Sequence, residues 1–463
     1  MPLDLPDTYY VALALLGGLT IWAAINLRKT WAPPFLAVLV AFGFWYMIEP
    51  LYVPREFVPF SRAIIRDAYF YSIVFLLSFA LLFIACAPLF RPGKARRGAG
   101  GRIDRKELAR TAEGLVIPVA ALWLVLVAYG TYRVGGDLLQ ALFPLEGRSG
   151  LRMWQRSAGS GAGASGFVVS AASYLYLLVS ATFGALLPLA RRRSTRLLLV
   201  ALICLSWPYL FLQGSRNQTL IAVLPFIASF FIFGRASRWL KVLTVLSACA
   251  LIFVWFGIVI QMRSDQLALT EVSFGEDITH YGLNMASELC WMLYFHQNEL
   301  MQPSWGGRYL AEALNFVPRA LWPGKPLIGI DYSILRGFGG TGTDIGVNAT
   351  ISTGLIGQGI ANFGPLFGSA CAGLLMALWA SFLWRLRVQA TLPRLLLFAL
   401  GLALTINLGR DITLLTLFPF VFGYIAVLAI EYRDKLQRRR ASKRRAKAEM
   451  RARHAELDAE WQG

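Results

Sequence analysis

AYFYSIVFLLSFALLFIACAPLF, residues 68–90, runs across the chain without a single charged side chain. About 20 apolar residues cross a bilayer as an α-helix, which satisfies its own backbone hydrogen bonds inside the hydrocarbon. The rest of the 463-residue chain has the same character, since 57% of its residues are hydrophobic and only 15% are charged. The sequence therefore predicts an all-α polytopic integral membrane protein and excludes an ordinary water-soluble fold.

Eleven apolar runs are predicted to be transmembrane helices. They cover residues 10–27, 34–53, 68–90, 115–132, 167–190, 197–212, 220–233, 242–262, 355–383, 395–408 and 412–430. The chain then divides into transmembrane helices 1–8 (1–262), a large late loop with an interfacial helix (263–354), transmembrane helices 9–11 (355–431) and a basic tail (432–463).

Positive charge predicts the orientation of these helices. Alternating the loops places most of the 45 Lys and Arg residues on one side, including the whole basic tail. Cytoplasmic loops carry such an excess. We therefore expect a multi-pass protein with the amino terminus and the late loop on the outer side of the membrane and the carboxyl terminus in the cytoplasm.

The cations left on the outward side are almost all arginines. A guanidinium group binds phosphate through two parallel hydrogen bonds, whereas lysine would serve equally well as a solvated charge. In LQGSRNQT, residues 212–219, Arg216 lies between two apolar runs with no acid nearby, at the expected start of the next helix. NLGRDIT, residues 407–413, repeats this pattern at Arg410, although Asp411 is adjacent and could neutralise it. Pairing with carboxylates or lipid headgroups is the structural alternative for each arginine.

The late loop begins with EDITHYGLNMASELCWMLYFHQNEL, residues 276–300. Its apolar residues recur at helical spacing, and His280, Asn284 and Glu288 share one row at i, i+4. This pattern predicts an interfacial amphipathic helix whose polar row is either a solvated face or part of a catalytic site. No metal-ligand spacing occurs among the histidines and acids, so no metal is expected.

Residues 327–364 are dense in Gly and Thr and are predicted to form an irregular loop that lines a polar cavity. Asp331, Arg336 and Asp344 lie in this stretch, and Trp305, Trp322 and Tyr332 lie in or near it. Aromatic side chains there would either stack on sugar rings or form an interfacial belt.

Two motifs carry a family resemblance. FVPRALWPGKP (316–326), followed by GLIGQGIANFGPLFG (354–368), resembles the paired signature of bacterial Wzy-type O-antigen and exopolysaccharide polymerases. GSRN (214–217) is similar to a short outward turn of the same family. The family often carries an acid in the second phrase, where this chain has Gln358.

The resemblance implies a GT-C-like membrane glycosyltransferase of the bacterial inner membrane, which joins lipid-linked oligosaccharide repeat units at the periplasmic face, the outer side of the orientation given above. The expected substrate is an undecaprenyl-pyrophosphate-linked oligosaccharide, and no cofactor is expected. The expected pyrophosphate ligands are Arg216, Arg319, Arg410, Lys325 and Arg263; the expected proton acceptors are His280, Asp331 and Asp344, with Glu276 and Asp277 as further candidates. The expected sugar contacts are Asn217, Trp322, Arg336, Gln358 and Asn362.

Two other functions remain open at this point. An O-antigen ligase would use the same kind of donor but a different acceptor, and a flippase would transport the lipid-linked unit. Membrane lipids and a chain-length regulator are the other expected partners, and nucleic acid is not expected. The basic tail is predicted to be a helix that lies along the anionic cytoplasmic leaflet.

Overall fold

The structure is a computed structural model that describes most of the chain. The described residues are 4–90, 105–145, 152–154, 164–212, 216–234, 237, 239–244, 246–248, 250–251, 254–255, 284–314, 317, 322–324, 329–337, 351–389 and 391–462. Within these ranges the regular structure is entirely helical, with no strand. This confirms the predicted all-α class.

The first half of the chain supplies the elements α1 (Asp7–Ile25), α2 (Ala32–Phe42), the π-helical turn η1 (Gly43–Met47), α3 (Glu49–Tyr52), the 3₁₀ turn η2 (Pro54–Phe57), α4 (Arg62–Phe90), α6 (Arg105–Arg133), α7 (Leu138–Leu142), α8 (Ala164–Leu186), α9 (Arg193–Leu212) and α10 (Arg216–Phe233). The second half supplies α12 (Met285–Gln297), α13 (Gly307–Ala313), α14 (Ile330–Leu335), α15 (Gly354–Phe363), α16 (Pro365–Gln389), α17 (Leu392–Arg410) and α18 (Leu414–Gln462).

Eight helices of the described chain are long and apolar enough to cross a membrane. They are Asp7–Ile25, Ala32–Tyr52, Arg62–Cys86, Lys106–Arg133, Val168–Leu186, Arg193–Leu212, Pro365–Gln389 and Leu392–Arg410. Run 220–233 is the shorter apolar helix Gln218–Phe233, and run 412–430 is the first part of α18. Run 242–262 is described only in part, and its described residues include the end of the short apolar helix Trp239–Ala248. A membrane-embedded helical protein is thus confirmed, and the count of eleven crossings stays a prediction.

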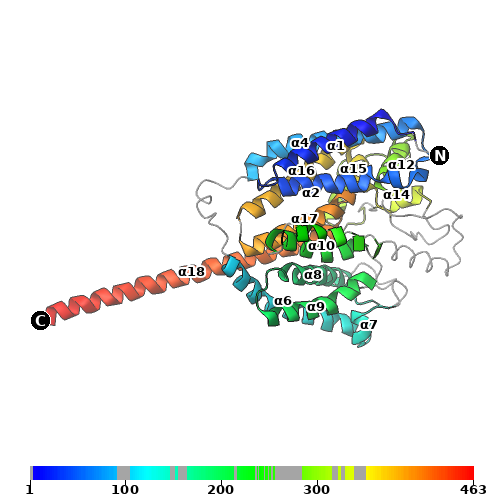
Figure 1. Ribbon diagram of the computed structural model, residues 1–463. Helices are drawn as coiled ribbons and strands as arrows, with labels where there is room; N and C mark the ends of the chain where they lie inside the picture. The colour runs from blue at the N-terminus through cyan, green and yellow to red at the C-terminus, as the bar shows by residue number, and fades with distance from the viewer. Residues whose placement is uncertain are drawn as a thin grey trace.

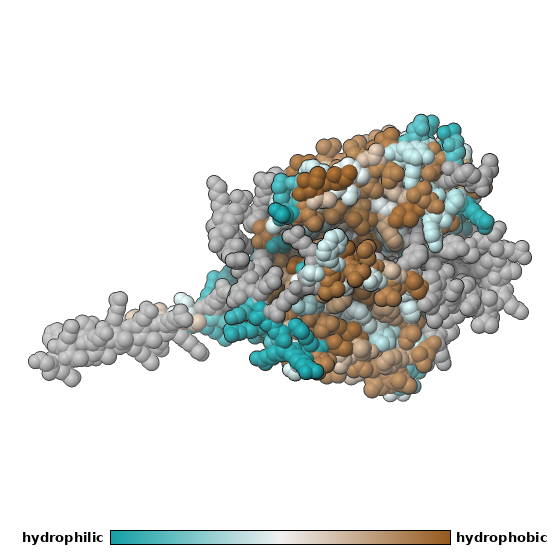
Figure 2. Space-filling view, in the orientation of Figure 1, coloured by the Kyte–Doolittle hydropathy of each residue, from teal (hydrophilic) through white to brown (hydrophobic). Residues whose placement is uncertain are grey.

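The surface of the bundle is apolar where lipid would contact it. Large side chains such as Ile25, Leu81 and Ile117 are more than half exposed although they lie in the middle or at the ends of apolar helices. Figure 2 shows brown, hydrophobic residues over much of the bundle and teal, hydrophilic ones near the root of α18. In water such a surface would be unfavourable, so it indicates contact with hydrocarbon.

The bundle contains two hydrophobic cores that share α16. The first core is formed by α1, α2, α4, α12, α15 and the part of α16 that extends to Ala380. The second is formed by α6, α8, α9, α10, α17, α18 and the last turns of α16, from Leu383 onward. In Figure 1, α1, α2 and α4 lie on one side of the bundle, α6 and α9 lie on the other, and α10 and α17 lie between them. Each core therefore combines segments from both halves of the chain.

The ends of the chain lie at opposite ends of the bundle. Figure 1 shows the amino terminus beside α12 and α14, whereas α18 leaves the bundle at the other end as one uninterrupted helix. The helical prediction for the basic tail is confirmed by α18, which extends to Gln462. Its predicted course along a lipid surface stays a prediction.

The ninth apolar run, predicted as one helix over 355–383, is two helices. α15 ends at Gly364, whose φ of +78° is accessible mainly to glycine, and Pro365 then begins α16. The prediction of an irregular loop over 327–364 is also wrong for α14 and α15. The turn brings the two helices so close that a Cβ on Gly359 would lie 2.1 Å from the carbonyl oxygen of Gly368. Glycine at both positions lets α15 fold back against α16.

Candidate functional site

Polar and charged residues from six separated segments converge around α15. This helix packs against α12, α13, α16 and α17, and α12 in turn contacts η1, α3 and α4. Figure 1 shows α12, α14 and α15 at the end of the bundle that holds the amino terminus, opposite the α18 tail. We call this group of residues the α15 site; its members are Tyr46, Glu49, Asn284, Glu288, Asp331, Tyr332, Arg336, Gln358, Asn362 and Arg410.

A buried ion pair forms the centre of the site. Glu288 of α12 has no exposed surface, and the Arg336 side chain just after α14 is 13% exposed. Arg336 donates from Nε and Nη2 to the two carboxylate oxygens of Glu288, both at 3.1 Å. Its guanidinium also lies over the ring of Trp291, 4.4 Å from the centroid. This two-bond geometry fixes the register of α14 on α12.

Two more donors complete the surroundings of Glu288. Asn284 Nδ2 donates to Oε1 at 2.9 Å, and the Tyr332 hydroxyl donates to Oε2. Burial, reinforced by the neighbouring Glu288 charge, raises the pKa of Tyr332 well above its usual value, so the phenol keeps its proton. Burial would lower the pKa of Arg336, but Glu288 outweighs it and raises that pKa. Arg336 therefore keeps its positive charge beside Glu288.

The start of α12 rests on a second buried carboxylate. Glu49, only 1% exposed, accepts hydrogen bonds from the backbone N–H of Ala286 at 2.6 Å and of Ser287 at 3.2 Å. The first N–H groups of a helix have no partner within the helix, and the Glu49 oxygens supply acceptors for two of them. Asn284, just before α12, and Glu288 are both buried, so the solvated alternative for the polar row does not hold for these two residues.

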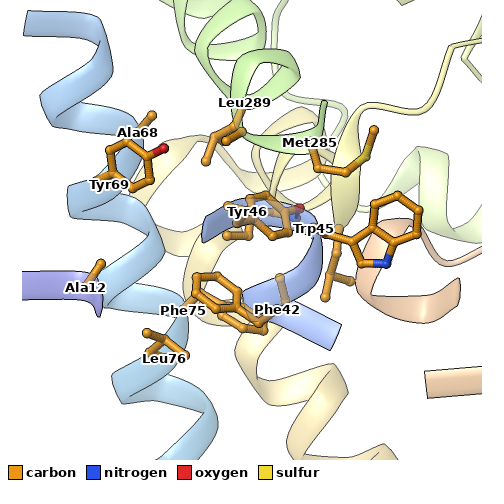
Figure 3. Close-up of a cluster of buried hydrophobic side chains, with 14 of the residues drawn as sticks. Ala12, Phe42, Trp45, Tyr46, Ala68, Tyr69, Phe75, Leu76, Met285 and Leu289 are labelled. Atoms are coloured by element: carbon orange, nitrogen blue, oxygen red, sulfur yellow. Dashed lines mark hydrogen bonds between the residues drawn. The ribbon is translucent and has the colours of Figure 1, made fainter. Parts of the chain in front are cut away.

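Tyr46 connects this region to α15. Its hydroxyl oxygen accepts a hydrogen bond from the Ile356 backbone N–H at 3.1 Å. Figure 3 shows Tyr46 between the rings of Phe42 and Phe75 on one side and Met285 of α12 on the other. Because the Tyr46 ring is stacked on Phe42, and Phe42 on Phe75, this hydrogen bond fixes the position of the first turn of α15 on the first core.

Two of the predicted sugar contacts, Gln358 and Asn362, lie on α15 with their amides partly engaged. Gln358 donates to the Ile412 carbonyl at 3.3 Å and accepts from its N–H at 2.8 Å, which ties α15 to the turn between α17 and α18. Asn362 accepts from the Ser304 hydroxyl and the Tyr309 N–H, both at 3.2 Å. Asn362 is buried, whereas Gln358 is half-buried and lies nearer the surface.

Arg410 is the last residue of α17, two positions before Ile412, whose backbone Gln358 binds. Its Nε is buried without a hydrogen-bond partner, and its guanidinium carbon lies 5.9 Å from the centre of the Trp45 ring. Within the described ranges no carboxylate forms an ion pair with it, and the neighbouring Asp411 does not neutralise it as the sequence suggested. Trp45 is held in place by its own Nε1, which donates to the Ile406 carbonyl at 2.6 Å. The site thus holds one fixed cation with unused donors.

The predicted base Asp331 is already paired. Its Oδ2 accepts from Arg308 Nη2 at 2.6 Å, and its Oδ1 accepts from the Tyr332 N–H at 2.9 Å. The carboxylate remains 40% exposed, so one side still faces solvent. Arg336, predicted to contact sugar, uses two of its donors on Glu288.

The remaining predicted residues are only partly described. Trp322 is half-buried, and Arg216 begins α10, as its predicted position at a helix start required. α10 packs against α17, the helix that Arg410 ends. The side chains of Arg216 and Asn217, and all of His280, Asp344, Arg319, Lys325, Arg263, Glu276 and Asp277, lie outside the described residues.

Sequence reasoning missed Glu49, Tyr46 and the partner of Glu288. The signal for Glu49 was present, because an acid inside an apolar run that spans a membrane is costly and marks a site. Searched over the described residues, no group of three or more His, Cys, Asp or Glu side chains is placed to hold a metal ion. No protein-family model matches the chain, and no curated protein or solved structure shows significant similarity to it.

Proposed function

We propose that the chain is an inner-membrane polymerase of lipid-linked oligosaccharide repeat units, with eleven crossings and the α15 site on the periplasmic face. The acceptor hydroxyl oxygen attacks the anomeric carbon of the donor glycan, and the bond from that carbon to the pyrophosphate oxygen breaks. Undecaprenyl pyrophosphate leaves with its electron pair, and the hydroxyl proton passes to a base. The leaving group therefore requires fixed positive charge in a site with little water.

Arg410 is the observation that carries this proposal. The Nε of this half-buried guanidinium is buried without a hydrogen-bond partner, which is unfavourable unless an anion completes it, and a pyrophosphate oxygen has the required geometry. The half-buried Gln358 amide and the indole of Trp322 are suitable for the sugars nearby. We propose Arg216 at the start of α10 as the second cation, since α10 packs against α17.

Loss and replacement of the gene in its host tests the proposal. We expect a deletion strain to carry surface acceptor capped with a single repeat unit and no ladder on a gel. The wild-type chain restores the ladder, whereas Arg410→Lys, which keeps the charge but loses the fork, does not. Arg66→Lys serves as the matched control, because Arg66 is an exposed arginine paired with its neighbour Asp67.

The same gel distinguishes the rival functions. A strain that loses all capped material points to an O-antigen ligase, and one that accumulates lipid-linked units inside the cell points to a flippase. A full ladder from Arg410→Lys at wild-type protein levels would remove Arg410 from the reaction.

A further inference from the structure

A second feature lies at the other end of the bundle, where the basic tail emerges. The ends of α8 and α10 and the starts of α6 and α9 enclose a cavity of about 600 Å³. Its size is that of a site for a small organic ligand rather than for single waters. None of its lining residues belongs to the α15 site.

The walls of the cavity are apolar and its edge is cationic. Phe226, Phe230 and Phe233 of α10 face the segment that follows α8, and Arg191 and Arg196 are the only charged residues among its described lining. Arg196 donates from Nε to the Ala190 carbonyl at 2.8 Å, which orients its guanidinium and leaves the terminal nitrogens as donors.

Glu113, an acid of the adjoining helix α6, directs its ion pair away from the cavity arginines. Glu113 of α6 accepts the backbone N–H groups of Arg191 and Arg192, both at 2.9 Å, and its carboxylate pairs with the Arg192 side chain at 3.4 Å. Arg192 does not line the cavity. Glu113 therefore fixes the backbone of this turn, and its side-chain ion pair leaves Arg191 and Arg196 to face the cavity.

We propose that this cavity binds one anionic glycerophospholipid of the leaflet that surrounds it. The phosphate lies between Arg191 and Arg196, and one acyl chain lies along the phenylalanines of α10. Basic pockets between membrane helices on the cytoplasmic side recognise anionic headgroups in this way. An apolar wall beside paired cations matches a lipid phosphate better than free phosphate, which would leave the wall exposed to water. The inference goes beyond the proposed function and does not depend on it.

Native mass spectrometry of the full chain, purified and delipidated in detergent, tests this site. Phosphatidylglycerol and phosphatidylcholine are titrated against the wild type, against Arg191→Gln/Arg196→Gln and against Arg192→Gln/Arg193→Gln. The last variant removes the same charge from the same turn but no residue that lines the cavity. At roughly fivefold per arginine, we expect the first variant to lose on the order of 30-fold in affinity for phosphatidylglycerol and the control to lose little.

A third variant separates the cavity from the charges. Leu187→Trp fills the cavity from its wall while both arginines remain, so tight phosphatidylglycerol binding is again expected to be lost. Melting in lipid-free detergent checks that each variant is folded. Equal binding of phosphatidylcholine and phosphatidylglycerol by the wild type, undiminished binding by Arg191→Gln/Arg196→Gln, or full displacement by inorganic phosphate overturns the proposal.

Discussion

The Glu288–Arg336 pair gives the sharpest test of how the α15 site is held together. Arg336→Met keeps the unbranched apolar part of the side chain but leaves Glu288, which has no exposed surface, without its cation. Removing one partner of a buried pair costs about 3–5 kcal/mol. Asn284 and Tyr332 still donate to the carboxylate, so we expect the lower end, about 3 kcal/mol.

A double-mutant cycle isolates the pair itself. Glu288→Gln, Arg336→Met and their combination are compared by equilibrium unfolding with SDS in mixed micelles. The double variant should lose less free energy of unfolding than the sum of the two single variants. We expect the difference to be roughly 2–3 kcal/mol, because both changes remove the same interaction. Arg66→Met is the control, since the Arg66–Asp67 pair is exposed and worth no more than about 1 kcal/mol. Additive effects, or an Arg336→Met variant as stable as the control, would refute the reasoning.

Two further changes probe the surroundings of the site. Gly359→Ala places a Cβ 2.1 Å from the carbonyl oxygen of Gly368, so it should cost about 1–3 kcal/mol in the same unfolding assay, while Gly17→Ala, with nothing within 4 Å, should cost far less. Burial, and then the charge of Glu288, raises the pKa of Glu56 above its ordinary value of 4.5. The stability that this raised pKa gives to the folded protein is therefore fully present below pH 4.5, and it is lost as the pH rises through the raised pKa. Glu56→Gln should therefore be more stable than wild type at neutral pH and equal to it in acid, and a constant difference across that range would contradict the assignment.

Much of the fold follows from the sequence because membrane helices are local. Each apolar run satisfies its backbone within itself, so the spans over residues 62–86 and 193–212 are recognisable without knowledge of their neighbours. The break at Gly364 was missed because apolar residues continue on both sides of it. A glycine followed by proline was the available signal, and hydropathy alone does not detect it.

The site was harder to predict because its contacts are remote along the chain. Arg410 was recognisable as a cation near the end of an apolar run, and Gln358 as a polar residue within the motif of residues 354–368. That Gln358 would clamp Ile412, or that Arg336 would be committed to Glu288, depends on how the helices pack. The sequence also left open whether Asp411 pairs with Arg410, since adjacency in sequence does not set the direction of a side chain at a helix end.

The seating of Glu49 also sets a condition on biosynthesis. The backbone groups that hold its carboxylate belong to residues 237 and 238 positions later in the chain. At about 5–20 residues per second, roughly 10–50 s pass between the synthesis of Glu49 and that of its donors. During that interval the Glu49 side chain must stay hydrated, carry a proton, or contact the translocation machinery. The amino-terminal helices therefore reach their final packing around Glu49 only after α12 has been synthesised.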